Sequence, residues 1–173
     1  MHSVKPSVIA LSNLSELGAR LSSDEVSAYS ALARSYGMKL FMDGARFANA
    51  VASGAESPAA LTWRAGVDAM SFGATKNGAM AAEALIFFHP DDAALAEFHR
   101  KRSGHLWSKH RYLAAQFDAY LQDDLWLRLA SKSNDKMAQV KDVIDATDFI
   151  SVVAGGDANE LFVSMKPEVA AFL

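Results

Sequence analysis

Short apolar runs recur along the first ninety residues and are separated by segments with helical spacing. The runs are bounded by turn residues, which is typical of buried strands. We expect such strands at residues 8–11, 38–42, 67–72 and 84–88. Helices are expected from Ser22 or Ser23 to Gly37, over 47–52, and from Ser57 to about Gly66. Strands that alternate with helices predict a largely parallel α/β sheet.

The first of these helices shows its apolar positions at helical spacing, at Val26, Tyr29, Ala33 and Tyr36. The pattern changes from Pro90 onward, where one helix should continue into the basic cluster 100–102. After Gly104 a long amphipathic helix is expected, with a break near Asp123-Asp124 and an end near Val143. Its apolar face is formed by Leu113, Phe117, Tyr120 and Leu121.

The last thirty residues have the pattern of a small α+β unit. Segments 149–153 and 160–164 resemble a strand pair around Gly155-Gly156, and Pro167 starts a final helix. We therefore divide the chain into part of a large domain, a connecting helical region and the start of a small domain, at residues 1–105, 106–143 and 144–173.

Composition narrows the class of protein without identifying it. Seventeen Lys and Arg residues stand against twenty Asp and Glu residues, so the net charge of −3 offers no general attraction to nucleic acid or an anionic membrane. The absence of cysteine excludes disulfides, thiolate nucleophiles and cysteine-based zinc sites. No stretch reaches the roughly 18 to 20 apolar residues of a membrane span. We expect a soluble cytoplasmic protein without a signal segment, a nucleic-acid partner or a membrane partner.

Reactive side chains follow two of the predicted strands. The run 38–42 ends at Asp43, and the run 67–72 is followed by Lys76 in Ser71-Phe-Gly-Ala-Thr-Lys-Asn-Gly78. The carboxyl ends of parallel strands are where open α/β sheets bind ligands. A carboxylate that pairs with a pyridine nitrogen and a lysine that holds an aldehyde as a Schiff base are the groups that pyridoxal 5'-phosphate requires. The two residues therefore suggest a site for this cofactor.

Each candidate also has an ordinary structural interpretation. Asp43 could cap a helix or turn, Lys76 could be a solvated loop lysine, and Arg46 could form a surface ion pair. In a cofactor site, the guanidinium of Arg46 could instead bind the cofactor's phenolate oxygen or a substrate carboxylate. The hydroxyl of Thr75 could bind a phosphate oxygen or close a turn. No metal site is expected, since no two histidines have helical ligand spacing.

Two segments carry a specific resemblance to a known family. Met42-Asp-Gly-Ala-Arg-Phe-Ala-Asn-Ala50 and Gly66-Val-Asp-Ala-Met-Ser-Phe-Gly-Ala-Thr-Lys-Asn-Gly-Ala79 resemble low-specificity L-threonine aldolases, pyridoxal-phosphate enzymes of fold type I. The resemblance extends through Trp63-Arg64, residues 101–116 and residues 155–159, so it covers nearly the whole chain.

The resemblance implies a role for each candidate. Lys76 would be the Schiff-base lysine, Asp43 the partner of the pyridine nitrogen, and Arg46 a contact to cofactor or substrate. Lys109 or Arg111 would offer a cation to the cofactor phosphate of a neighbouring subunit, although a solvated helix face fits these two residues equally well. The implied reaction is cleavage of L-threonine or L-allo-threonine to glycine and an aldehyde.

The resemblance also sets the expected extent of the chain. Members of the family are considerably longer, and their phosphate-binding Gly-Thr turn and ring-stacking histidine would precede Val4. The expected fold is therefore the C-terminal half of a fold-type-I large domain with the start of a small α+β domain, from a homodimer or homotetramer. Two alternatives stay open: another lyase of this fold, which eliminates at the β-carbon or cleaves phenylserine, and an inactive fragment with only an assembly role.

Overall fold

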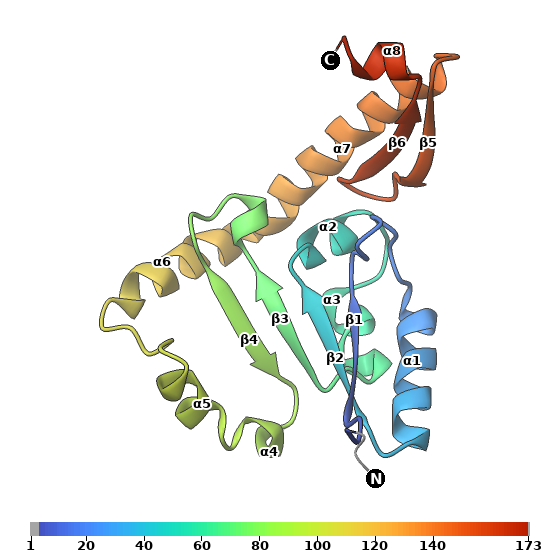
Figure 1. Cartoon of the computed structure of the whole chain (residues 1–173). Helices are drawn as coiled ribbons and strands as arrows, with labels where there is room; N and C mark the ends of the chain where they lie inside the picture. The colour runs from blue at the N-terminus through green and yellow to red at the C-terminus, as the bar shows by residue number, and fades with distance from the viewer. Residues whose placement is uncertain (1–3, 173) are drawn as a thin grey trace.

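A four-stranded sheet forms the centre of the structure, a computed structural model that describes residues 4–172 (Figure 1). Across the sheet the strands follow the order β1 (Val8–Ser12), β2 (Lys39–Gly44), β3 (Ala69–Gly73) and β4 (Glu83–Phe87). β1 and β3 both pair with β2 in parallel, whereas β4 is antiparallel to β3. β4 runs back because only a short turn, without a crossover helix, connects it to β3. The predicted α/β class and mostly parallel sheet are confirmed.

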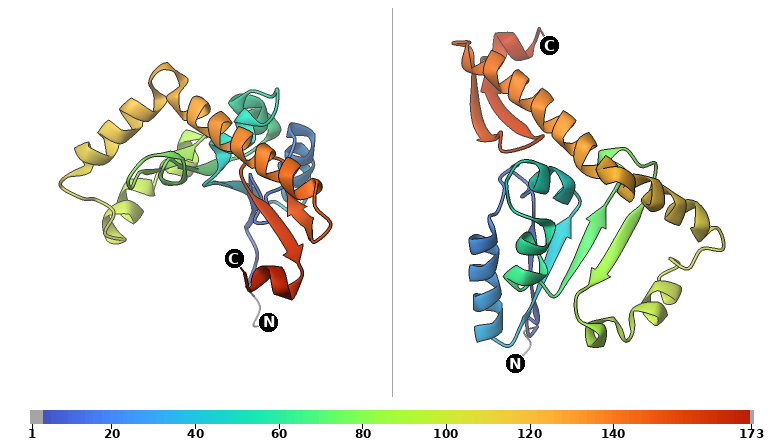
Figure 2. Two further views of the ribbon diagram at one scale, coloured as in Figure 1. Left: turned by 90° about the horizontal axis from the view of Figure 1, so that it is seen from above. Right: turned by 180° about the vertical axis from the view of Figure 1, so that it is seen from behind.

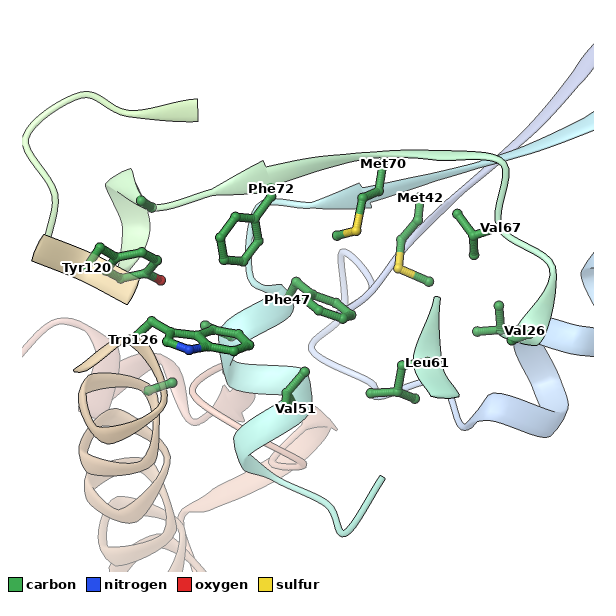
Figure 3. Packing of buried hydrophobic residues seen from close by; sticks show 14 of the residues in the cluster. Val26, Met42, Phe47, Val51, Leu61, Val67, Met70, Phe72, Tyr120 and Trp126 are labelled. Carbon is green, nitrogen blue, oxygen red and sulfur yellow. The ribbon is translucent and has the colours of Figure 1, made fainter. Parts of the chain in front are cut away.

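Helices cover one face of this sheet: α1 (Ser23–Ser35), α2 (Phe47–Ala52), α3 (Pro58–Leu61) and the 3-10 turn η1 (Trp63–Ala65). Their buried side chains pack against Met42, Met70 and Phe72, which point from the strands toward the helices in Figure 3. This layer between sheet and helices is the main core of the described residues.

α1 begins as predicted but buries a different set of positions. The side chain of Ser22 accepts a hydrogen bond from the Glu25 amide, and the Glu25 carboxylate accepts one from the Ser22 amide, which forms a capping box. Tyr29 and Tyr36, expected on the apolar face, are 44% and 72% exposed. Ser30 is buried instead, because α1 lies so close to the turn at Gly66 that the Ser30 hydroxyl donates to the Gly66 carbonyl.

Side chains on the opposite face of the sheet are exposed or half-buried. Val8 of β1 and Leu85 of β4 are 50% and 57% exposed, and an apolar row crosses all four strands at Ala10, Phe41, Ala69 and Phe87. The run 8–11, expected to form a buried strand, is therefore covered on one face only, since Val8 and Ala10 are exposed.

Residues after β4 form an arm that leads to a small antiparallel hairpin (Figure 2). Two short helices replace the single helix expected from Pro90, and the long helix breaks where it was expected to break. The elements are α4 (Pro90–Ala93), α5 (Ala96–Arg102), α6 (His110–Leu121), η3 (Gln122–Asp124), α7 (Leu125–Asp145), β5 (Ile150–Gly155), β6 (Leu161–Met165) and α8 (Pro167–Ala170). No helix among residues 4–172 is long and apolar enough to cross a membrane.

An elbow between α6 and α7 brings the arm back to the sheet. Asp123 and Asp124 have φ values of 50° and 55°, a left-handed conformation that interrupts the helix. Tyr120, before the elbow, and Trp126, after it, pack with Phe117 around the ring of Phe72 on β3. Leu121, expected on the apolar face, is 50% exposed because the helix ends there.

Glu56 connects the start of α1 with the end of α2. Its carboxylate accepts a hydrogen bond from the Ser23 amide at 2.9 Å and pairs with Arg20 at 2.7 Å, and Arg20 also donates to the Ala50 carbonyl. The hydrogen bonds from Ser23, followed by that from Arg20, lower the pKa of Glu56 from 4.5 to about 2. A carboxylate at the N-terminus of α1 is also favoured by the helix dipole.

We predict that Glu56→Gln destabilises the chain in a pH-dependent way. The folded-state pKa lies below the unfolded one, so the contribution of the carboxylate is fully present above pH 4.5 and is lost as the pH falls toward 2. Urea titrations should show a lower free energy of unfolding for the variant than for the unmodified chain at pH 7. This difference should shrink as the pH falls from 4.5 toward 2. Glu97→Gln, which removes an exposed carboxylate on α5, is the control. A Glu56→Gln difference that is constant with pH would contradict the prediction.

Candidate active site

Asp43 is the last but one residue of β2 and lies on the sheet face that the helices leave uncovered. In the parallel register it sits between Ser12 of β1 and Ser71 of β3, so three polar residues form a row at the carboxyl ends of the strands. Its Oδ1 accepts hydrogen bonds from the Ala45 amide at 2.9 Å and from the Ser71 hydroxyl at 3.2 Å. Both bonds use the same oxygen, so among residues 4–172 Oδ2 has no side-chain or turn donor and can accept a hydrogen bond from a ligand.

Lys76 lies just beyond the carboxyl end of β3, in the 3-10 turn η2 (Thr75–Asn77), and its side chain is exposed. The turn is closed by the hydroxyl of Thr75, which accepts a hydrogen bond from the Ala82 amide at 3.2 Å. Thr75 thus serves the turn, one of the two roles considered for it. The turn ends at Gly78, whose φ of 110° is in the region that favours glycine.

Two glycines bring the ends of β2 and β3 together. A Cβ on Gly44 would lie 2.3 Å from the carbonyl oxygen of Ser71, and a Cβ on Gly73 would lie 3.0 Å from the Cα of Ala45. The Ser71 hydroxyl also accepts a hydrogen bond from the Gly44 amide at 3.2 Å. Asp43, one residue before Gly44, and Lys76, three residues after Gly73, are therefore held at one edge of the sheet.

Asn77 anchors the turn of Lys76 to the elbow between α6 and α7. Its side-chain amide is buried and donates to the Tyr120 hydroxyl at 2.6 Å and to the Trp126 carbonyl at 2.8 Å. Burial raises the pKa of the Tyr120 hydroxyl, while the hydrogen bond from Asn77 acts in the opposite direction. A neutral Tyr120 is therefore part of the anchor at physiological pH.

Arg46 follows β2 as the residue before α2 and forms an ion pair with Glu160 of the distant β5–β6 hairpin. The ion pair considered for Arg46 thus exists, and it joins two parts of the fold. Lys109 and Arg111 lie elsewhere, at the start of α6, and both are exposed. Tyr120, near the other end of α6, makes the contact with Asn77, so Lys109 and Arg111 lie about 16 Å and 14 Å from that contact along the helix axis.

The structure therefore brings Asp43, Arg46, Thr75 and Lys76 to one edge of the sheet and leaves Lys109 and Arg111 apart from it. Sequence reasoning missed Ser71, Asn77 and Glu160. Ser71 and Asn77 belong to the motif that contains Lys76, but their roles depend on strand register and on a helix far along the chain. Chemically, the edge presents a carboxylate with a free oxygen, an accessible primary amine and a guanidinium. Such groups can bind a cationic heterocycle, form an imine and bind a carboxylate.

Comparisons with known proteins identify the family of the chain. The family model for beta-eliminating lyases matches residues 1–167. Low specificity L-threonine aldolases from Pseudomonas aeruginosa and a Pseudomonas species are 40% and 36% identical over 172 and 166 residues, which are 99% and 96% of this chain but 50% and 48% of theirs. A threonine aldolase structure from Leishmania major matches with a TM-score of 0.90 and 31% identity, over 99% of this chain and 50% of that one.

The open, mostly parallel sheet and its likeness to the Leishmania major structure show that the chain has the fold of about half of a fold-type-I enzyme. The chain belongs to the beta-eliminating lyase family. It spans about half the length of the curated relatives that it matches. A putative L-allo-threonine aldolase from Listeria monocytogenes, 19% identical with a TM-score of 0.72, shares the fold.

We predict that Asn77→Ala destabilises the chain and loosens the turn of Lys76. Two hydrogen bonds are lost and the Tyr120 hydroxyl and Trp126 carbonyl remain buried without this donor, so the cost should be about 2–4 kcal/mol. The matched control is Asn134→Ala on α7, which also removes two side-chain hydrogen bonds, those to Asn49 of α2. Both variants should unfold at lower urea concentration, but only Asn77→Ala should speed hydrogen exchange at residues 75–79. Equal exchange in the two variants would contradict the anchoring role.

Proposed function

We propose that this chain carries the lysine and the aspartate of a pyridoxal-phosphate-dependent aldolase. Its substrates would be L-threonine and L-allo-threonine, and its products glycine and acetaldehyde. The observation that supports this most is the position of Asp43 and Lys76 at the ends of adjoining strands, tied by the Ser71 hydroxyl and by the close approach of Gly44 and Gly73. The names of the relatives, which match over nearly the whole chain, point to the same activity.

The residues at this edge fit the two reactive ends of the cofactor. Asp43 offers Oδ2 to the pyridine nitrogen, and Oδ1 is already fixed by the Ala45 amide and the Ser71 hydroxyl, so the carboxylate is oriented beforehand. Lys76 offers an exposed amine on a turn that Asn77 and Thr75 hold in place. Among the described residues, this edge of the sheet offers no comparable group for the cofactor's phosphate, since the Thr75 hydroxyl closes the turn.

When bound, pyridoxal phosphate supplies an electron sink for the substrate's α-carbon. The carboxylate of Asp43 would hold a proton on the pyridine nitrogen through charge pairing. Lys76 would bind the cofactor's aldehyde covalently and give it up to the substrate's amine. Arg46 would bind the substrate carboxylate through guanidinium hydrogen bonds and so orient the Cα–Cβ bond.

The bond that breaks would be the one between Cα and Cβ. The β-hydroxyl loses its proton, the carbon–oxygen bond becomes a carbonyl as the aldehyde leaves, and the electron pair stays with Cα until a proton returns there to give glycine. We assign the base that accepts the hydroxyl proton to none of the candidate residues named above. The family description also covers β-elimination, which would instead release ammonia and a 2-oxo acid.

The intact protein is proposed to be a cytoplasmic homodimer or homotetramer, with the division at 1–105, 106–143 and 144–173 as its domain plan. The segment before α6 supports subunit contact, because Leu95, Phe98 and Trp107 expose 61%, 72% and 49% of their surface. Lys109 and Arg111 follow this segment, so they could reach the phosphate of a neighbouring subunit's cofactor if that segment forms the interface.

Borohydride trapping tests the proposal directly. We predict that the chain mixed with pyridoxal phosphate and then sodium borohydride carries an irreversible label, which peptide mass spectrometry locates at Lys76. Asp43→Asn should retain the label but lower aldolase activity about 100-fold or more, since the charge that stabilises the protonated ring is lost. Lys132 and Lys136 of α7 are internal controls and should stay unlabelled.

Two other results would count against the proposal. Labelling spread evenly over the lysines, or absent at every cofactor concentration, would favour a fragment with an assembly role. Release of ammonia and a 2-oxo acid from L-threonine, without glycine and acetaldehyde, would favour the β-eliminating alternative.

A further inference from the structure

The turn between β5 and β6 docks on the loops that follow β1 and β2 (Figure 1). Ala158 at its centre is buried against Leu14 and Ala50. Asp157 accepts a hydrogen bond from the Arg20 amide at 3.0 Å. A small hairpin from the end of the chain is thus attached, by apolar and polar contacts, beside the edge that carries Asp43.

Glu160 is the residue of this turn that reaches the candidate site. Its Oε1 lies 2.5 Å from Nη2 of Arg46, and the two side chains are 17% and 27% exposed. Gly18, with a φ of 75°, allows the approach, since a Cβ there would lie only 3.0 Å from the Cβ of Glu160. The position of Glu160 is therefore set by tight backbone packing as well as by its charge.

The second oxygen of Glu160, Oε2, is buried and has no hydrogen-bond partner among residues 4–172. Arg46 is accordingly the only cation that the described residues place on this carboxylate. Removing Arg46 from Glu160 would leave a mostly buried charge unpaired, which is strongly unfavourable. A ligand that binds Arg46 should therefore find the ion pair intact and use the donors that remain.

The guanidinium of Arg46 can keep its ion pair with Glu160 and bind a ligand at the same time, because a guanidinium carries five N–H donors in a fixed plane. Fixing Nη2 on Glu160 restricts the direction in which the other N–H groups point. Arg46 is three residues from Asp43, on the loop that follows the same strand. Its remaining N–H groups are therefore cationic hydrogen-bond donors that the loop after β2 offers to the carboxylate of a substrate bound beside Asp43.

We infer that Glu160 is a positioning residue, which holds the guanidinium of Arg46 in the orientation that binds the carboxylate of an amino-acid substrate. The inference rests on the proposed function and extends it, since it makes the β5–β6 hairpin a part of the substrate site. Glu160 itself touches no substrate in this account. Its effect passes through Arg46.

Glu160→Gln tests the inference in the cofactor-loaded protein. The variant keeps the size of the side chain and removes its charge, so Arg46 loses its fixed partner. We expect the KM for L-threonine to rise about tenfold, the value of one charged hydrogen bond, with kcat little changed. Inhibition by threoninol, which has a hydroxymethyl group where threonine has the carboxylate, should not change.

Asp157→Asn is the matched control, because it removes a carboxylate charge from the same turn without touching Arg46. Its KM for L-threonine should equal that of the unmodified protein. An unchanged or lower KM in Glu160→Gln would overturn the inference, and a lower KM would mean that Glu160 competes with the substrate. An equal loss of threonine and threoninol binding would also overturn it, since a merely loosened turn would explain that result.

The outcome separates this inference from the proposed function. Failure to label Lys76 in the unmodified protein would contradict the aldolase proposal, and the substrate role of Glu160 would fall with it. The ion pair can then still be measured by comparing Arg46→Gln, Glu160→Gln and the double variant in urea. The double variant should lose less stability than the sum of the two single variants. Labelling of Lys76 with no effect of Glu160→Gln would leave the function standing and overturn the inference alone.

Discussion

The close contact between the ends of β2 and β3 is the constraint on which the site depends. Gly44 and Gly73 have no Cβ, so the backbone of each strand end can touch the other at distances that any side chain would prevent. The Ser71 hydroxyl uses this proximity to bridge the Gly44 amide and the Asp43 carboxylate. Without this contact, the positions of the Lys76 amine and the Asp43 carboxylate would not be fixed relative to each other. Here they share one edge because two strands are held in register.

Segments far along the chain complete this arrangement from two sides. Asn77 fastens the turn of Lys76 to the elbow between α6 and α7, and the aromatic cluster around Phe72 buries that contact. The loop of Arg46 is fastened to the β5–β6 hairpin by Glu160. α7 connects the elbow with the hairpin, so both attachments belong to one continuous arm. The geometry of the edge thus depends on residues as far along the chain as Glu160.

Local patterns in the sequence predicted most of the elements and placed the two proposed site residues, Asp43 and Lys76, at the ends of neighbouring strands. Apolar runs and capping residues gave the strands and α1, and the two aspartates predicted the helix break. The sequence could not show that β4 runs antiparallel, since a turn and a crossover differ only in the path between the strands. It also could not show that Ser71 faces Asp43, that Asn77 reaches Tyr120, or that Arg46 meets Glu160. These contacts depend on register and on packing between residues 28 to 114 positions apart.

Gly44→Ala is the most direct measurement of the central claim. The new methyl group would lie 2.3 Å from a backbone oxygen of β3, so the strand ends must separate. Gly37→Ala is the reference, because it meets open space and costs only the strain of its positive φ, about 1 kcal/mol. The account predicts that Gly44→Ala unfolds at lower urea concentration than Gly37→Ala and that borohydride no longer traps pyridoxal phosphate selectively on Lys76. Stability and selective trapping equal to those of Gly37→Ala would contradict it.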